Sequence, residues 1–205
     1  MSTPAVEELN ALLQARNRHI DAAGRAEVDG LIQQRFLARR AVLISDMSGF
    51  SRITQEEGIL HFLGLIQRMR ELVGPVIAEH GGNLVKAEAD NLYATFQTPS
   101  DAVRAAVGMH EACLADAVGR HFNDSVSVSL GLGWGEILDI DGDDFYGHEV
   151  NLASKLGEDI ATGGETFATQ AVVEAASDIG GFWWEQNSAR ISNIAFSYFK
   201  LQRNQ

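Results

Sequence analysis

The sequence is poor in cysteine, proline and positive charge, and it has no long apolar run. Cys113 is the only cysteine, which excludes an intrachain disulfide and is typical of a reducing compartment such as the cytoplasm. Three prolines, with 45% hydrophobic and 21% charged residues, exclude a mainly disordered chain. Because no stretch of about 18 apolar residues occurs and the first residues lack a basic stretch followed by an apolar one, neither a membrane span nor an export leader is expected.

Acidic residues outnumber basic ones by 28 to 16, which gives a formal net charge of −12. This balance argues against sequence-independent binding of nucleic acid and against docking on anionic lipid. The charge is unevenly divided, since residues 1–40 carry six arginines against five acidic residues while residues 41–205 carry a net charge of −13. An anionic ligand of the second segment would therefore need a recruited cation.

Length and patterning predict one domain, residues 41–205, preceded by a helical arm, residues 1–40. Apolar residues in the arm recur at helical spacing in two short stretches. A packing or dimerisation arm is the simpler interpretation of this segment, and a regulatory switch is the alternative.

The order of elements in the main segment predicts an α+β domain, with a mostly antiparallel sheet that carries helices on one face. The expected strands are 41–44, 84–86, 92–96, 126–130, 136–140, 165–168, 181–185 and 194–201. The expected helices are 59–77, 102–118, 150–156 and 171–176. Thr54 and Glu57 fit a capping box for the first of these helices, and Thr98 fits an N-cap for the second. Residues 131–135 are rich in glycine and predict a break between two strands.

Four charged side chains and one amide stand at positions where chemistry could occur. Asp46 ends a buried strand, and Asp90 lies in a tight turn four residues after Lys86. Asn151 and Lys155 share one face of a predicted helix. Each has an ordinary structural explanation as well: a helix cap for Asp46, turn chemistry for Asp90, and solvated surface for the other three.

Several other motifs fail on inspection. Residues 139–150 begin like a calcium loop, but position six is Asp144 where glycine is needed, and position twelve is Val150 where glutamate is needed. The glycines of residues 131–135 do not form a phosphate loop, and the six histidines show no metal-ligand spacing. Cys113 lies among apolar helical residues and is expected to be an inert thiol.

The ordered set of motifs is more informative than any single residue. Its members are Asp46-Met47-Ser48-Gly49-Phe50-Ser51, then Gly81-Gly82 leading to Lys86 and Asp90, then Asp144-Phe145-Tyr146-Gly147 leading to Val150-Asn151-Leu152-Ala153-Ser154-Lys155. This set resembles the class III nucleotidyl cyclase family, the catalytic domain of adenylate and guanylate cyclases. The resemblance covers about residues 41–205 and implies the ferredoxin-like core of that family.

The resemblance also implies a binding site for a nucleotide and metal ions. Asp46 and Asp90 would hold two magnesium or manganese ions, which an acidic domain needs in order to attract a triphosphate. Gly49, Phe50 and Ser51 would offer backbone amides to phosphate oxygens, helped by the start of the next helix.

The remaining motif residues imply the substrate and the reaction. Lys86 and Asp144 match the pair that reads the purine, a donor and an acceptor that favour ATP over GTP. Asn151 matches the residue that positions the ribose, and Lys155 stands where the family usually has arginine next to the α-phosphate. The implied reaction is in-line attack of the ribose 3′-hydroxyl on that phosphate, with release of pyrophosphate and no dedicated general base. In the family one site draws on two subunits, which implies a head-to-tail homodimer.

Three features depart from the family pattern. Lys155 replaces arginine, Ala89 stands where glycine commonly precedes the second aspartate, and the arm resembles no sensor domain that we can name. The first two bear on rate and the third leaves regulation open. A weakly active or inactive homologue that binds nucleotide or a partner as a regulatory module is therefore the alternative to an active adenylate cyclase.

Overall fold

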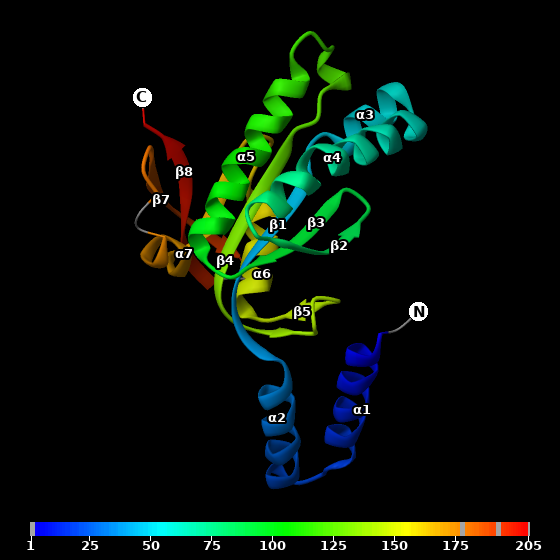
Figure 1. Cartoon of the computed structure of the whole chain (residues 1–205), viewed down its shortest axis with the longest axis vertical. Coiled ribbons are helices and arrows are strands. Elements are labelled where there is room, and N and C mark those ends of the chain that lie inside the picture. The colour runs from blue at the N-terminus through cyan, green and yellow to red at the C-terminus, as the bar shows by residue number, and fades with distance from the viewer. Residues whose placement is uncertain (1–2, 177–178, 192–193, 205) are drawn as a thin grey trace.

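The computed structural model describes residues 3–176, 179–191 and 194–204. Two helices at the N-terminus form an arm that projects from an α+β body, and strand β1 leads from the arm into that body (Figure 1). No helix within the described part of the chain is long and apolar enough to cross a membrane.

The arm is a helical hairpin of α1 (Pro4–Arg18) and α2 (Ala22–Phe36). Thr3 caps the first helix and Asp21 caps the second, where its carboxylate accepts a hydrogen bond of 2.7 Å from the Gly24 amide. The two helices bury a small apolar cluster of their own, to which Ile140 of the body also belongs. Both predicted helices are present, and β1 begins at Leu37, three residues before the expected end of the arm.

One sheet runs through the body, in the order β2-β3-β1-β4-β6-β8-β7, with β5 paired to β4. Its strands are β1 (Leu37–Met47), β2 (Asn83–Glu88), β3 (Asn91–Phe96), β4 (Val128–Asp139), β5 (Phe145–Tyr146), β6 (Thr166–Thr169), β7 (Phe182–Ile191) and β8 (Ile194–Arg203). Among the pairs in the described residues, β4 with β6 is parallel and the others are antiparallel. The predicted α+β class with a mostly antiparallel sheet is confirmed.

The helices of the body are α3 (Phe50–Glu57), α4 (Ile59–Glu79), α5 (Pro99–Ala117), α6 (His148–Ser154) and α7 (Gln170–Ala175), with a π-helix (Lys155–Ile160) directly after α6. Alternate residues of β1 point to opposite faces of the sheet. Leu43 belongs to the main core with residues of α4, α5 and α7, whereas Val42 and Ile44 pack with Val150 and Ala153 of α6. Helices therefore cover one face, as expected, and α6 in addition covers part of the other.

The predicted pair of strands over 126–140 is wrong, because the structure has one continuous strand, β4. Its glycines do not break the strand. They allow the backbone of α6 to pack directly against it. A Cβ at Gly131 would lie 1.9 Å from the Ala153 carbonyl oxygen, and one at Gly133 would lie 2.6 Å from that of Glu149. Close approach of two backbones, which composition alone does not reveal, explains the glycines.

The expected capping box at Thr54 is also wrong. Thr54 lies inside α3, and its carbonyl accepts the Gly58 amide at 3.0 Å. Gly58, with φ of +88°, separates α3 from α4 and serves as the N-cap residue of α4. The positive φ at this residue favours glycine and ends one helix where the next begins.

Candidate active site

Two predicted metal ligands meet at one end of the central strands. Asp46 is the penultimate residue of β1, and Asp90 lies in the turn between β2 and β3. Because β1 pairs with β3 in a register that sets Ser45 opposite Leu92, the end of β1 lies beside this turn. Both carboxylates line a pocket of about 500 Å³, formed by Asp46, Met47, Gly49, Phe50, Ser51, Arg52, Ala89 and Asp90.

The pocket concentrates negative charge. Partial burial, followed by the charges of Asp90 and Glu158, raises the pKa of Asp46 to about 6. Arg52 is the basic residue of the lining, but its guanidinium bonds Asn123 and, at 3.1 Å, Glu56. Two carboxylates that repel each other in a solvent-accessible pocket are suited to a hard divalent cation, whose other ligands can be water and substrate phosphates. The donor set therefore fits magnesium or manganese.

Backbone conformation shapes both sides of the pocket. Gly49 has φ of +98° and is the N-cap residue of α3, so the amides of Phe50 and Ser51 occupy the free first turn of that helix. On the other side Ala89 has φ of +49°, a left-handed conformation that glycine adopts without strain. Arg70 of α4 donates from Nη2 to the Ala89 carbonyl at 2.6 Å and fastens the turn that carries Asp90. Sequence reasoning did not identify Arg70, because no local motif marks it.

Lys86 and Asp144 form a direct pair although they lie 58 residues apart. The Lys86 ammonium donates to Asp144 Oδ1 at 2.9 Å, and the Tyr146 hydroxyl donates to Oδ2 at 2.6 Å. Burial alone would raise the pKa of Asp144, but the hydrogen bonds from Tyr146 and Lys86 outweigh it and the pKa is lowered. Burial alone would lower the pKa of Lys86, but the hydrogen bond and the charge of Asp144 outweigh burial, so the Lys86 pKa is raised. Lys86 is therefore a charged donor and Asp144 a charged acceptor at neutral pH.

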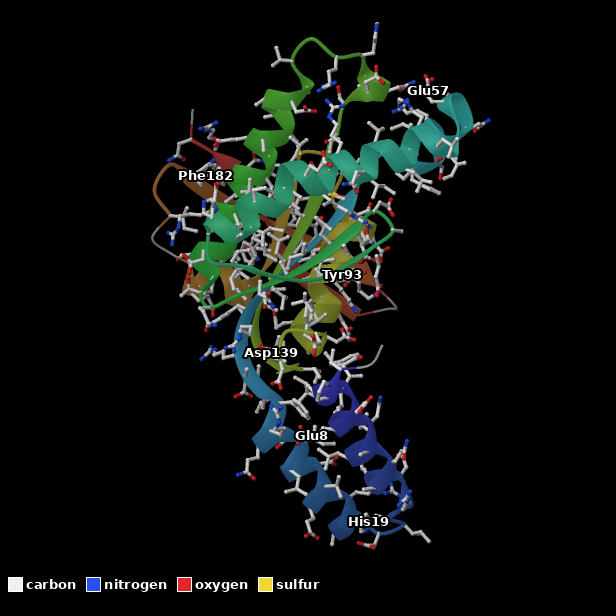
Figure 2. All side chains as sticks on the ribbon, turned by 45° about the vertical axis from the view of Figure 1, so that its right-hand side comes forward. Glu8, His19, Glu57, Tyr93, Asp139 and Phe182 are labelled. Atoms are coloured by element: carbon white, nitrogen blue, oxygen red, sulfur yellow. The ribbon has the colours of Figure 1, made fainter. Side chains whose placement is uncertain are left out.

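Tyr146 and Glu158 are further polar groups that the sequence did not single out. The hydrogen bond to Asp144, together with burial, raises the pKa of Tyr146 to about 12, so its hydroxyl keeps its proton and can donate. Glu158 accepts a hydrogen bond of 3.4 Å from the Tyr93 hydroxyl and adds negative charge near Asp46. Figure 2 labels Tyr93 on the hairpin of β2 and β3.

Asn151 lies in the middle of α6, and Lys155 directly follows that helix. Asn151 is exposed on that helix, and Lys155 is the first residue of the π-helix. The Lys155 side chain is 42% exposed and its ammonium lies 4.0 Å from Asp159, a loose contact that leaves it available. Lys86, Asp144, Asn151 and Lys155 are all absent from the lining of the acidic pocket. These four residues therefore lie outside the acidic pocket of their own chain.

No protein-family model matches the chain. A curated relative, provisionally named adenylate cyclase 3, from Rhizobium meliloti (strain 1021), is 26% identical over 117 residues. The match covers 57% of this chain, and it spans only 20% of the length of that relative.

Solved structures are similar over a larger part of the chain. The adenylate/guanylate cyclase/hydrolase from Silicibacter pomeroyi has a TM-score of 0.68 at 26% identity, over 82% of this chain and 99% of that one. The guanylate cyclase domain of RhGC from Catenaria anguillulae, in complex with GTP, has a TM-score of 0.66 at 15% identity, over 82% and 97% of the two chains. These neighbours define a nucleotide cyclase domain fold.

The chain therefore has the fold of the class III adenylate/guanylate cyclase catalytic domains, which its motifs predicted. Adenylate and guanylate cyclases both occur among its neighbours, so the comparisons support nucleotide cyclisation as the class of reaction. The choice of nucleotide must be argued from the site itself.

Proposed function

We propose that this protein is an adenylate cyclase that converts ATP to 3′,5′-cyclic AMP and pyrophosphate. The observation that carries this proposal is the pair of Lys86 and Asp144, held 2.9 Å apart as a charged donor and a charged acceptor. Adenine offers an acceptor at N1 and a donor at its amino group, which match this pair, whereas guanine presents the opposite pattern at these positions. Polar groups that face the wrong pattern reject a substrate strongly, because they are left unpaired when it binds.

The acidic pocket supports binding of the triphosphate. Asp46 and Asp90 would hold two Mg²⁺ or Mn²⁺ ions, which when bound supply positive charge against the phosphates. The amides at Gly49, Phe50 and Ser51 would donate hydrogen bonds to phosphate oxygens at the open first turn of α3.

Two side chains outside the acidic pocket, those of Asn151 and Lys155, would act on the ribose and the α-phosphate. Asn151 would orient the ribose so that its 3′-hydroxyl lies in line with the bond that breaks. Lys155 would stabilise the negative charge that develops as pyrophosphate leaves. Both residues are reachable from solvent, since Asn151 is exposed and the Lys155 side chain is 42% exposed.

We further propose that each active site forms between two copies of the chain in a head-to-tail homodimer. The supporting observation is that the base-reading and ribose-positioning residues do not line the acidic pocket of their own chain. A second copy could supply them, and two equivalent sites would follow from the symmetry. The reaction would take place in the cytoplasm, where Cys113 stays reduced.

The direct test is an assay of the purified chain with ATP, GTP, CTP and UTP, each with Mg²⁺ or Mn²⁺. Cyclic AMP from ATP should be the main product, identified by chromatography against standards. Asp46→Asn, which removes one charged ligand, should abolish it, and Asp143→Asn, an exposed acid on the turn before β5, is the matched control. Binding of ATP without cyclisation of any nucleotide would favour the alternative, a regulatory module, which Lys155 in the place of the family's arginine suggests.

The shared site has a separate test. Homodimers of Asp46→Ala and of Asn151→Ala should each be nearly inactive, because each lacks one half of both sites. A mixed dimer of the two should regain one intact site out of two. Tandem affinity tags on the two chains verify the heterodimer, and a verified heterodimer without activity would reject the shared-site arrangement.

A further inference from the structure

The turn between β4 and β5 is held by the N-terminal arm. Arg35 of α2 donates from Nη1 and Nη2 to the two carboxylate oxygens of Asp141, at 2.9 and 2.5 Å. Its Nε also donates to Glu8 of α1 at 3.0 Å, so one guanidinium ties both arm helices to the turn. A planar guanidinium that holds a carboxylate at two points fixes its orientation as well as its distance.

An apolar contact accompanies this ion pair. Ile140, the residue before Asp141, is fully buried and belongs to the same cluster as Leu9, Ile32 and Phe36 of the arm. The body thus inserts one side chain into the core of the arm. Figure 1 shows the arm next to the β5 region, and Figure 2 shows Asp139 of the body at this junction, above Glu8 of α1.

The turn from Ile140 to Asp144 is short and closed by its own hydrogen bonds. The Ile140 amide donates to the Asp144 carbonyl at 2.9 Å, and the Asp143 amide donates to the Ile140 carbonyl at 2.9 Å. Asp141 itself has φ of +52°, which a non-glycine residue holds only when its surroundings enforce it. On the far side Gly142 lies against β2, where a Cβ would be 2.7 Å from Asn83 Nδ2.

We propose that Arg35 is a positioning residue for the base-reading pair: through Asp141 the arm fixes the turn that ends at Asp144, and so sets how Asp144 faces Lys86 and the purine. This inference rests on the proposed adenylate cyclase function. It assigns the arm a part in nucleotide selection, beyond packing. The residue acts through the turn and does not itself touch the substrate.

The test replaces Arg35 in the full chain and reads nucleotide selection. Arg35→Glu sets three carboxylates together and should lower the ATP-to-GTP ratio of kcat/KM by about 2–5-fold, the effect expected of a half-exposed ion pair. The loss should appear mainly in KM. Arg35→Gln, which adds no repulsion, should show a smaller change in the same direction, and it keeps the test open if the glutamate variant does not fold.

Charge reversal provides the decisive comparison. Arg35→Glu combined with Asp141→Arg restores an ion pair of opposite polarity and should return the ratio to within about twofold of the parent. Arg25→Glu is the matched control, because it makes the same change of charge at the far end of the arm. There the Arg25 side chain donates to the carbonyls of His19 and Ile20. That variant should leave the ratio unchanged.

Binding of a fluorescent ATP analogue, measured without turnover, separates this inference from the proposed function. If the parent cyclises no nucleotide, the proposed reaction fails, and the inference is judged on affinity alone. A folded Arg35→Glu chain, verified by circular dichroism, that keeps the parent's affinity and ATP-to-GTP ratio would overturn it. Equal losses in Arg35→Glu and Arg25→Glu, or no recovery in the charge-reversed chain, would overturn it too.

Discussion

Asp46→Asn should make the metal-free protein more stable while it abolishes catalysis. In the folded chain, partial burial and then the neighbouring charges of Asp90 and Glu158 raise the pKa of Asp46 from 3.8 to about 6. A carboxyl whose pKa is higher in the folded state binds its proton more tightly there than in the unfolded chain. Stability is therefore lost as the pH rises from about 4 through 6, and the full cost persists above that range.

The size of the effect follows from this shift. About two pKa units at about 1.36 kcal/mol each give an upper limit near 3 kcal/mol. Because Asp46 is only half-buried, solvent screening reduces the expected cost to about 1–2 kcal/mol. For a chain of this size, removing that cost should raise Tm by about 2–8 °C.

The assay is thermal or urea unfolding in EDTA at several values of pH. Asp46→Asn should unfold at a higher temperature than the parent at pH 8, and the difference should shrink as the pH falls towards 4. Asp143→Asn, which removes an exposed carboxylate, is the control and should change Tm little. Mg²⁺ with a non-cyclisable ATP analogue should stabilise the parent more than Asp46→Asn. Equal Tm values at every pH would refute the electrostatic argument, and activity within a few-fold of the parent would refute the role in metal binding.

Three further sets of substitutions test other parts of the site. Lys86→Glu with Asp144→Cys should lower the use of ATP relative to GTP, and an unchanged ratio in a folded, active variant would remove the pair from purine recognition. Lys155→Arg should raise kcat with little change in KM. Lys155→Ala should lower kcat by about 10²–10³-fold in a single-turnover comparison. Full activity in the alanine variant would show that Lys155 is only a solvated helix residue. Ala89→Gly should relieve the left-handed strain at φ of +49° and stabilise the chain by up to about 1 kcal/mol in urea unfolding, whereas a loss of stability would show that the turn is not strained.

Local signals in the sequence account for much of the fold. Thr98, followed by proline and Asp101, predicted the start of α5, and the Thr98 side chain does accept the Asp101 amide at 3.2 Å. The tight turn around Asp90 was also predicted, between the expected strands 84–86 and 92–96, and it joins β2 to β3. By contrast, the glycines of β4 were wrongly taken as a break between two strands. Glycine is needed there because the backbone of α6, about 20 residues further along the chain, packs directly against β4.

The candidate site, like the fold, was predictable from the sequence only in part. The residue types at Asp46, Asp90, Lys86 and Asp144 were evident from motif order, and the last two do form a pair in the structure. Their roles in metal binding and base recognition stay predictions. The sequence held no sign of Arg70, whose contact with the Ala89 carbonyl depends on how α4 lies over the β2–β3 turn.

By itself, then, the sequence determined the class of fold, the acidic character of the main domain and the family motifs, because composition, periodicity and spacing are properties of neighbouring residues. The tertiary structure alone decided which groups meet across long separations. Arg35 and Asp141 are 106 residues apart, and no periodic pattern joins them. The raised pKa of Asp46 likewise arises from burial and from carboxylates that other elements bring beside it. Hydrogen bonds and charge interactions act through space, so they are set by packing, which a reading along the chain does not contain.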